Sequence, residues 1–215
     1  MPEPVKPRRY DSPRRRAQAE ATRREILDAA ERLFLRDGYA TTTMAAIAKE
    51  AGVALKTVYV GFETKSGVLR ALWNLRLRGD QADVPIQDRP WYREVLAEPD
   101  PERALRLGAH EARLVKERAG GLFGVLRSAA DSDPDIAALW ERINAEFHAN
   151  QRAVLEALGP LRPGLELERA ADIMWTLNHP DVWQLLVGRR GWTPDEWEEW
   201  FVTTLSVTLG TGYAS

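Results

Sequence analysis

Apolar residues near the N-terminus recur at the spacing of one helix face. They fall at positions i, i+4, i+7 and i+8, which lie on the same side of a helix with 3.6 residues per turn. The residues are Ile26, Ala30, Leu33 and Phe34. Gly38 follows them and is a typical helix end. The spacing therefore predicts an amphipathic helix from about residue 18 to residue 37.

Three further helices with very short connections are predicted before residue 80. The second is expected to begin after its cap, Thr42, and to end at Gly52. The third is expected over 54–61, with Val58 and Phe62 four residues apart on one side. A longer fourth helix is expected after its cap, Thr64, and should run to about Arg78.

Beyond a polar loop at 79–90, the chain repeats one kind of helix start. The segments DPER (100–103), DPDI (133–136) and TPDE (193–196) each place Asp or Thr before a proline. Such a residue caps a helix, and proline fits its first turn. No run alternates with period two between turn residues, so no strand is predicted. The expected fold class is all-α.

The last two helices are expected at about 168–188 and 194–210. Both carry more than one apolar stripe, so each must be covered on more than one side. Pro180 interrupts the first of them. It either kinks this helix or begins a new segment capped by Asn178 or His179.

The short second and third helices, joined by Ala-Gly-Val and preceded by a longer helix, match a helix-turn-helix. Its second helix stands out from the domain and enters the major groove of DNA. Gly52 can adopt the positive φ that the sharp turn requires. The residues expected to face outward on the third helix are Leu55, Lys56, Thr57, Tyr59 and Val60. Only a partner explains the exposure of Leu55 and Tyr59.

The distribution of charge along the chain agrees with a DNA-binding N-terminal part. Residues 1–80 carry 16 Lys and Arg against 10 Asp and Glu, net +6, and residues 81–215 carry 14 against 22, net −8. A basic front suggests contact with a polyanion, although chance imbalance on a solvated surface is the alternative. We expect a disordered basic tail at 1–18 and a helix-turn-helix domain at 19–66. The fourth helix connects it to a larger helical domain at 80–215.

The run GYATTTMAAIAKEAGVALKTVYVGFETKSGVL, residues 38–69, resembles the DNA-binding domain of the TetR family of transcriptional repressors. The rest of the chain resembles the family only in length and helical layout. The resemblance implies a homodimer, a recognition helix at 54–60, and a ligand pocket in the C-terminal helices whose occupation releases DNA. It also implies that the last two helices form the dimer interface; filling a larger monomer core is the alternative.

The resemblance assigns roles on the DNA-binding side, where Thr42 also matches the family pattern. Four residues match family positions that usually hydrogen-bond phosphates: Thr43, Thr57, Tyr59 and Lys65. The chain departs from the pattern at Ala54, which removes a capping hydroxyl, at Lys56, which replaces Gly, and at Gly61. Lys56 is a candidate for a guanine edge or a phosphate, and Leu55 for a thymine methyl. The Arg-rich tail resembles arms that enter a minor groove; a solubilising tail is the alternative.

The break at Pro180 places polar groups in an apolar wall. We therefore expect a ligand-binding group drawn from this break and from the aromatic-rich middle helices. The candidates are His110, Phe123, Trp140, Phe147, Trp175, Asn178 and His179. Ordinary core packing is the alternative for each.

Enzyme chemistry lacks support in the sequence. There is no cysteine, and the three histidines stand far apart without a metal-binding spacing. No nucleophile elbow, phosphate-binding loop or dinucleotide fingerprint occurs. The N-terminus has no apolar run behind its basic residues, so neither a secretory signal nor a membrane anchor is expected. We expect no catalytic residue, no metal, no cofactor and a cytoplasmic location.

The sequence thus predicts a homodimeric repressor that binds double-stranded DNA at a pseudo-palindrome and is released by a small-molecule effector. Its two recognition helices should lie about 34–36 Å apart, or a multiple of that spacing. Two alternatives stay open. One is a DNA-binding regulator without an effector, whose rear half only dimerises. The other, more remote, is a helical ligand-binding enzyme.

Overall fold

A computed structural model describes residues 13–78 and 86–210, and in this part of the chain every regular element is helical. Most of the expected tail and residues 79–85 of the expected polar loop lie outside the described residues. The chain divides into two compact units, Met1–Leu72 and Trp73–Ser215, and the boundary falls within one helix. Each unit is described by itself.

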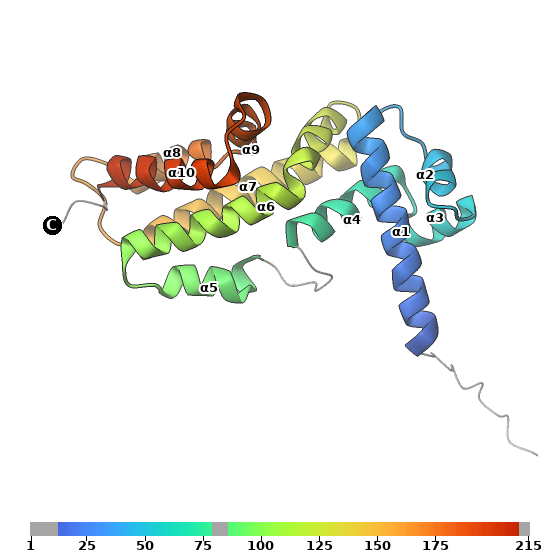
Figure 1. Ribbon diagram of the computed structural model, residues 1–215, viewed down its shortest axis with the longest axis horizontal. Helices are drawn as coiled ribbons and strands as arrows, with labels where there is room; N and C mark the ends of the chain where they lie inside the picture. Colours follow the sequence, from blue (N-terminus) through green and yellow to red (C-terminus); the bar gives the residue numbers. More distant parts are fainter. Residues whose placement is uncertain (1–12, 79–85, 211–215) are drawn as a thin grey trace, which may run out of the picture. The chain divides into compact units, whose positions relative to one another are not determined.

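The N-terminal unit contains four helices, drawn in blue to green in Figure 1. They are α1 (Pro13–Asp37), α2 (Met44–Glu50), α3 (Leu55–Phe62) and the first half of α4 (Lys65–Arg78). Helix α1 begins at Pro13 and not near residue 18, so residues 13–18 are helical where a tail is expected. Proline fits the first turn of a helix, and the Arg, Ala, Gln and Glu that follow are good helix formers.

Apolar faces of all four helices meet in the core of this unit. The side chains of Phe34, Ile47, Val58 and Leu69 are each at most 1% exposed. They come from α1, α2, α3 and α4 respectively, so every helix contributes to one core. Burial of such side chains stabilises a fold by roughly 1.5–3 kcal/mol each. The short helices α2 and α3 depend on this packing, because isolated helices of their length are unstable in water.

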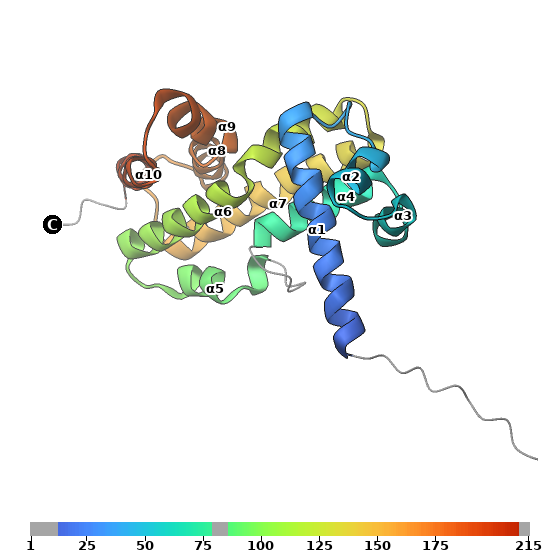
Figure 2. The ribbon, with the colours of Figure 1, turned by 45° about the vertical axis from the view of Figure 1, so that its right-hand side comes forward.

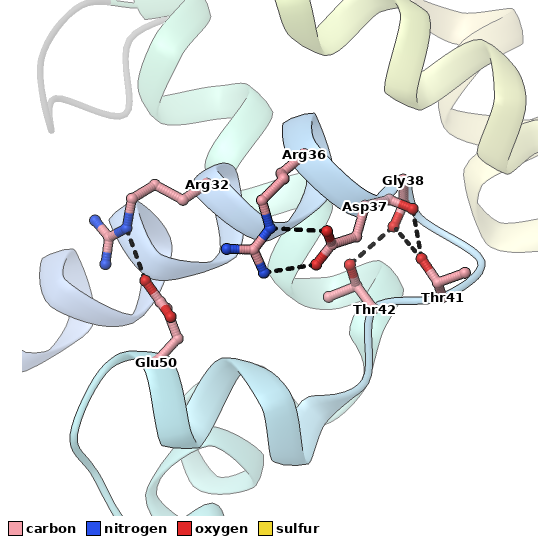
Figure 3. Close-up of polar contacts among 7 residues, drawn as sticks. All are labelled: Arg32, Arg36, Asp37, Gly38, Thr41, Thr42 and Glu50. Carbon is pink, nitrogen blue, oxygen red and sulfur yellow. Dashed lines mark hydrogen bonds and ion pairs between the residues drawn. The ribbon is translucent and has the colours of Figure 1, made fainter.

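In the loop between α1 and α2 (Figure 3), the threonine that caps α2 is not the one that the sequence predicts. Thr43, and not Thr42, is the cap of α2, and its hydroxyl oxygen accepts from the N–H of Ala46 at 3.1 Å. Thr42 is buried, and its hydroxyl donates to the carbonyl of Gly38 at 2.8 Å. Gly38 itself has a φ of +83°, which ends α1 as expected.

The C-terminal unit is a helical stack around two long helices. Its elements are η1 (Ile86–Asp88), α5 (Pro90–Ala97), α6 (Pro101–Ala130), α7 (Pro134–Leu158), α8 (Leu167–Leu177), α9 (Pro180–Trp183), the π-helical segment η2 (Gln184–Arg189) and α10 (Pro194–Leu209). Helices α6 and α7 run side by side, with α5 on one side and α8 and α10 on the other (Figures 1 and 2).

The three helix starts expected from the sequence are confirmed. Asp100 and Asp133 cap α6 and α7 with their carboxylates, and Thr193 caps α10 in a full capping box with Glu196. Each cap precedes a proline in the first helical turn. A side-chain cap of this kind contributes about 1 kcal/mol to helix stability.

The region around Pro180 resolves into a new helix start. His179 caps α9, and its Nδ1 accepts from the N–H of Asp181 at 3.2 Å. Of the two possibilities at Pro180, a new segment capped by His179 is confirmed: α8 ends at Leu177, and α9 and η2 follow. Proline lacks the N–H that a continuous helix would need at this point.

Aromatic side chains dominate the core of the C-terminal unit. Trp197 is completely buried, stacks on Phe201 with ring centroids 5.1 Å apart, and meets Trp183 edge-on at 5.1 Å. Aliphatic side chains of α6 and α7 complete this core, among them Leu105 and Leu155.

Candidate functional site

Helix α3 presents one face to the core and the other to solvent, as the sequence predicts. Val58 and Phe62 are buried, whereas Leu55, Tyr59 and Val60 are 41%, 48% and 76% exposed. Lys56 and Thr57 are also exposed. Because residues i, i+1, i+4 and i+5 share one side of a helix, four of these residues form a continuous outward surface. We call it the recognition surface: Leu55, Lys56, Tyr59 and Val60.

Helix α1 contacts the C-terminal end of α3 and holds it in position. The guanidinium of Arg23 donates to the carbonyl of Gly61 at 2.9 Å and lies 4.3 Å from the centre of the Phe62 ring. Carbonyl groups in the last turn of a helix lack intrahelical partners, so this bond satisfies one of them. Sequence reasoning missed Arg23, since nothing in the local pattern ties it to a residue 38 positions away.

A second arginine of α1 ties down α2 (Figure 3). Arg32 Nε lies 3.0 Å from Glu50 Oε1, at the end of α2. The pair is largely exposed, so its contribution to stability is at most about 1 kcal/mol. The pair mainly positions α2 against α1. Helix α1 therefore contacts both helices of the helix-turn-helix through its arginines.

The turn between α2 and α3 has the conformation expected of it. Gly52 has a φ of +67°, and Val53 N–H donates to the carbonyl of Ala48 at 3.0 Å. Ala54 occupies the cap position of α3 without any side-chain hydrogen bond. The loss of a capping hydroxyl expected at this position is confirmed.

Helix α3 ends in a strained turn. Glu63 has a φ of +62° and a ψ of −50°, and the N–H of Thr64 donates to the carbonyl of Phe62 at 2.6 Å. This combination is a γ-turn with positive φ, which is rare for a residue with a side chain. Gly67 then lies so close to α3 that an added Cβ would stand 2.1 Å from the carbonyl oxygen of Phe62.

The threonine and lysine candidates take different positions. Thr43 is exposed at the start of α2, whereas Thr42 is buried with its hydroxyl on Gly38. The ammonium of Lys65 donates to the carbonyl of Tyr39 at 2.7 Å and lies 4.1 Å from the centre of the Tyr39 ring. Of these three side chains, Thr43 is the one that the structure leaves open to a partner.

Six of the seven ligand candidates fall into three places in the C-terminal unit, and Phe147 is the seventh. Phe123 lies between Trp73 and Trp140, with ring centroids 4.7 Å and 6.4 Å away. Phe147 is partly buried on α7. His110 is exposed on α6, with Nδ1 3.5 Å from the carboxylate of Glu198, so it stands apart from the aromatic candidates.

The third place joins Trp175, Asn178 and His179 at the end of α8. The rings of Trp175 and His179 lie 4.9 Å apart, edge to face. Asn178 is 5% exposed, and its side-chain amide donates to Gln151 Oε1 at 3.3 Å. Its carbonyl oxygen accepts from the ammonium of Lys116. We call Lys116, Gln151 and Asn178 the buried polar cluster.

Lys116 is the residue of this cluster that sequence reasoning missed. Its ammonium lies 4.5 Å from the centre of the Trp197 ring, and the residue is 5% exposed. Burial lowers the pKa of the ammonium from 10.5 to about 7. No carboxylate of the described residues forms an ion pair with it. A signal was present, since Lys116 falls on the apolar face of α6 that also carries Leu105, Ala109 and Ala119.

Two further groups around the cluster affect its electrostatics. Burial lowers the pKa of His179 below its usual value, and the charges of Arg127 and Lys116 add to this effect while Asp181 opposes it. The indole N–H groups of Trp175 and Trp197 are buried and have no hydrogen-bond partner within the described residues. Two buried indole N–H groups, one on α8 and one on α10, are therefore left without an acceptor among the described residues.

The described residues offer neither a metal-binding group nor a membrane-spanning helix. No group of three or more His, Asp or Glu side chains suited to a metal ion occurs in residues 13–78 and 86–210. Within the same ranges, no helix combines the length and the apolarity needed to cross a membrane.

The fold and the recognition surface together define a helix-turn-helix protein with a separate helical domain. Residues 26–72 match the model of the bacterial regulatory proteins of the tetR family. The HTH-type transcriptional regulator AcrR of Shigella flexneri is 41% identical over 58 residues, which are 27% of this chain and 27% of AcrR. The chain thus matches about a quarter of the length of this relative.

Solved structures extend the likeness to most of the chain. NalD, the secondary repressor of the MexAB-OprM multidrug efflux pump in Pseudomonas aeruginosa, superposes with a TM-score of 0.68 at 22% identity, over 89% of this chain and 98% of NalD. The complex of SmeT with triclosan gives a TM-score of 0.66 at 22% identity, over 87% and 90% of the two chains. These matches establish the fold.

Residues 26–72 therefore form a DNA-binding domain of the tetR type, and the solved structures show that the fold of the rest of the chain is shared as well. The resemblance of residues 38–69 to the TetR family, and the all-α fold with an N-terminal helix-turn-helix, are confirmed.

Proposed function

We propose that the chain is a repressor that binds a pseudo-palindromic operator as a homodimer and releases it when a small molecule occupies the C-terminal unit. The observation that carries this proposal is the recognition surface. Leu55, Tyr59 and Val60 are large apolar side chains held outward on a short helix, where only a partner explains their exposure. A protruding second helix of a helix-turn-helix fits the major groove.

The recognition surface suits both parts of DNA recognition. The ammonium of Lys56 is the cation at its centre and is suited to the O6 and N7 acceptors of guanine, or to a phosphate. Leu55 offers an apolar contact for a thymine methyl. Tyr59, Thr57 and Thr43 carry hydroxyls suited to phosphate oxygens, which fix the orientation on the duplex. Lys65 and Thr42 donate to backbone carbonyls within the N-terminal unit, so their proposed role is to hold the recognition surface in place.

A homodimer follows from the geometry that an operator demands. Two recognition helices must reach major grooves about 34–36 Å apart on one side of the DNA, and a twofold dimer provides this. Helices α8 and α10 are the proposed interface. Val207 on α10 is 56% exposed, and Trp200 lies partly exposed beside Trp192 with ring centroids 6.0 Å apart. A regulator of transcription acts where the DNA is, which is the cytoplasm of a bacterial cell.

Release by a small molecule is supported by the polar break in the C-terminal core and by the triclosan bound to SmeT. A ligand lowers DNA affinity only if it binds the released form more tightly than the DNA-bound form. The candidates for its contacts are those of the sequence analysis, with Trp175, Asn178 and His179 as the group that the fold brings together. Helix α4 belongs to both units and is the proposed lever between them.

The first test is selection of bound duplexes from a random DNA pool at physiological salt. Enrichment of an inverted repeat with half-sites about one turn apart is expected. The selected duplex is then used with three variants. Tyr59→Phe removes a hydroxyl from both half-sites and should weaken binding by about 1–3 kcal/mol in total, at about 0.5–1.5 kcal/mol per hydrogen bond, whatever the sequence.

Lys56→Ala should either relax one base position or lower the salt dependence of binding by about one ion per half-site. Lys49→Ala is the matched control, because Lys49 is an exposed lysine on α2 outside the recognition surface. If Lys56→Ala and Lys49→Ala have equal effects, α3 is not the recognition helix. If no duplex is enriched, the proposed function fails.

The effector is tested separately on the same duplex. A small molecule that binds with saturation and weakens DNA affinity supports the regulated repressor. Saturable DNA binding that no ligand alters supports the alternative regulator, whose C-terminal unit only dimerises.

A further inference from the structure

The buried polar cluster has a deficit of acceptors and of negative charge. A lysine ammonium carries three donor hydrogens, and Lys116 directs one of them to Asn178. The amide of Asn178 is itself committed to Gln151. No described carboxylate pairs with Lys116, although an isolated buried charge is costly. The cluster therefore lacks an anion.

A second observation points the same way. Trp197 is completely buried, and its indole N–H has no acceptor among the described residues. The face of the same ring lies against the Lys116 ammonium. The indole N–H of Trp175, three residues before Asn178, is likewise buried and without an acceptor. Buried polar groups in folded proteins nearly always have partners, so these N–H groups call for a partner outside the described chain.

We propose that the buried polar cluster is the anion-binding part of a ligand site, and that the ligand is a small organic carboxylate whose charge is placed on Lys116. The proposal rests on the proposed function only in taking this ligand to be the effector. A carboxylate brings the acceptors and the charge that the cluster lacks. The net charge of −8 over residues 81–215 does not argue against an anionic ligand, because surface charge does not set the charge of a buried site.

The aromatic side chains near the cluster indicate the apolar part of the ligand. Trp183 and Trp197 lie next to each other, and Trp175 stands against His179. Aromatic walls with a few polar groups are typical of sites for small organic molecules. An aromatic or aliphatic acid suits such apolar surroundings better than an inorganic anion does.

The π-helical segment η2 lies against the same stretch of α6. Gly120, one turn after Lys116, has the amide of Gln184 and the ring of Trp183 as its nearest neighbours. Gln184 is the first residue of η2. Segments of π-helix occur frequently at functional sites, because their widened turns place side chains where an α-helix cannot. The cluster and η2 therefore share one region of the C-terminal unit.

The test uses matched pairs of an acid and its neutral amide with the full-length protein. The probes are benzoate and benzamide, 1-naphthoate and 1-naphthamide, and octanoate and octanamide. Binding is followed by quenching of tryptophan fluorescence and by calorimetry. Within a pair, shape is nearly constant and charge differs. At least one acid is expected to bind about tenfold or more tightly than its amide, the factor that one charge-assisted hydrogen bond gives.

Two variants locate the preference. Lys116→Met removes the charge at similar volume, and Lys116→Gln keeps a donor toward Asn178. Both should reduce the preference for the acid to less than about twofold. Arg142→Met is the control, since it removes an exposed cation from α7 of the same unit. Circular dichroism establishes that the variants are folded.

The proposal is overturned if no acid binds more tightly than its amide, or if the preference survives in both Lys116 variants. DNA binding separates this outcome from failure of the proposed function. If the acid binds through Lys116 but leaves DNA affinity unchanged, the site stands and the effector role is rejected. If the protein selects no duplex, the proposed function fails while the acid-binding result keeps its meaning.

Discussion

Lys116 should make the stability of the protein rise with pH above neutrality. Its ammonium has a pKa of about 7 in the folded chain, against 10.5 for an ordinary lysine, because it is buried. Between these two values the unfolded chain binds a proton that the folded chain does not. Stability therefore increases as the pH rises through this range and is lowest where both forms are protonated.

The size of the effect follows from the two pKa values. At about 1.4 kcal/mol per pKa unit, their difference corresponds to about 5 kcal/mol between pH values below 7 and above 10.5. From pH 7 to pH 9 the folded chain should gain about 2 kcal/mol. The neighbouring His179 has a lowered pKa, so its own titration falls below this window. Arg113 is paired with Glu198 and Asp195, and Arg127 with Asp181.

The assay is urea unfolding at pH 7, 8 and 9 at one fixed protein concentration. Tryptophan fluorescence reports mainly on the C-terminal unit, because seven of the eight tryptophans lie beyond residue 80. Wild type and the control Arg142→Met should gain about 2 kcal/mol relative to Lys116→Met over this interval. Parallel stability profiles of all three proteins would refute the assignment of a buried, weakly basic lysine.

Three predictions concern local geometry, each measured by urea unfolding followed by circular dichroism or fluorescence. Gly67→Ala should destabilise the N-terminal unit by about 2–3 kcal/mol, since its Cβ would clash with the Phe62 carbonyl; a neutral effect contradicts the close approach. Glu63→Gly should stabilise this unit by about 1 kcal/mol by relieving the positive φ, and a loss would show that no strain is stored there. Thr193→Ala should cost about 1 kcal/mol by removing the cap of α10, unless Glu196 compensates alone.

The N-terminal unit could be predicted closely because its signals are local. Gly38 and Gly52 both take a positive φ and end helices where the pattern places them. The residues expected to face outward on α3 do so, since the spacing of Val58 and Phe62 fixes its buried side. The cap of α2 was assigned one residue too early. Three threonines in succession all offer a hydroxyl, and only the path of the chain after Gly38 decides which one reaches the α2 backbone.

The C-terminal unit was predictable at its helix ends and much less in its interior. Capping residues before proline are local signals, so Asp100, Asp133 and Thr193 were found. Which side chains meet across helices depends on packing that no spacing reveals. His110 was grouped with aromatic residues but lies exposed beside Glu198. The contact of Lys116 with Asn178 joins residues 62 positions apart, on two helices.

The two units differ in how they satisfy their cations, and this difference bears on their roles. In the N-terminal unit, Arg23, Arg32 and Lys65 each have an acceptor within the domain, and these contacts hold the short helices around one core. The recognition surface is therefore preformed. In the C-terminal unit, Lys116 joins α6 to α8, and through Asn178 to Gln151 of α7, without a counter-charge in the described residues. An anion bound there would change the charge at a point where three helices meet. A bound ligand can shift a conformational equilibrium only through contacts that differ between two states, and an incomplete polar cluster shared by three helices is suited to provide them.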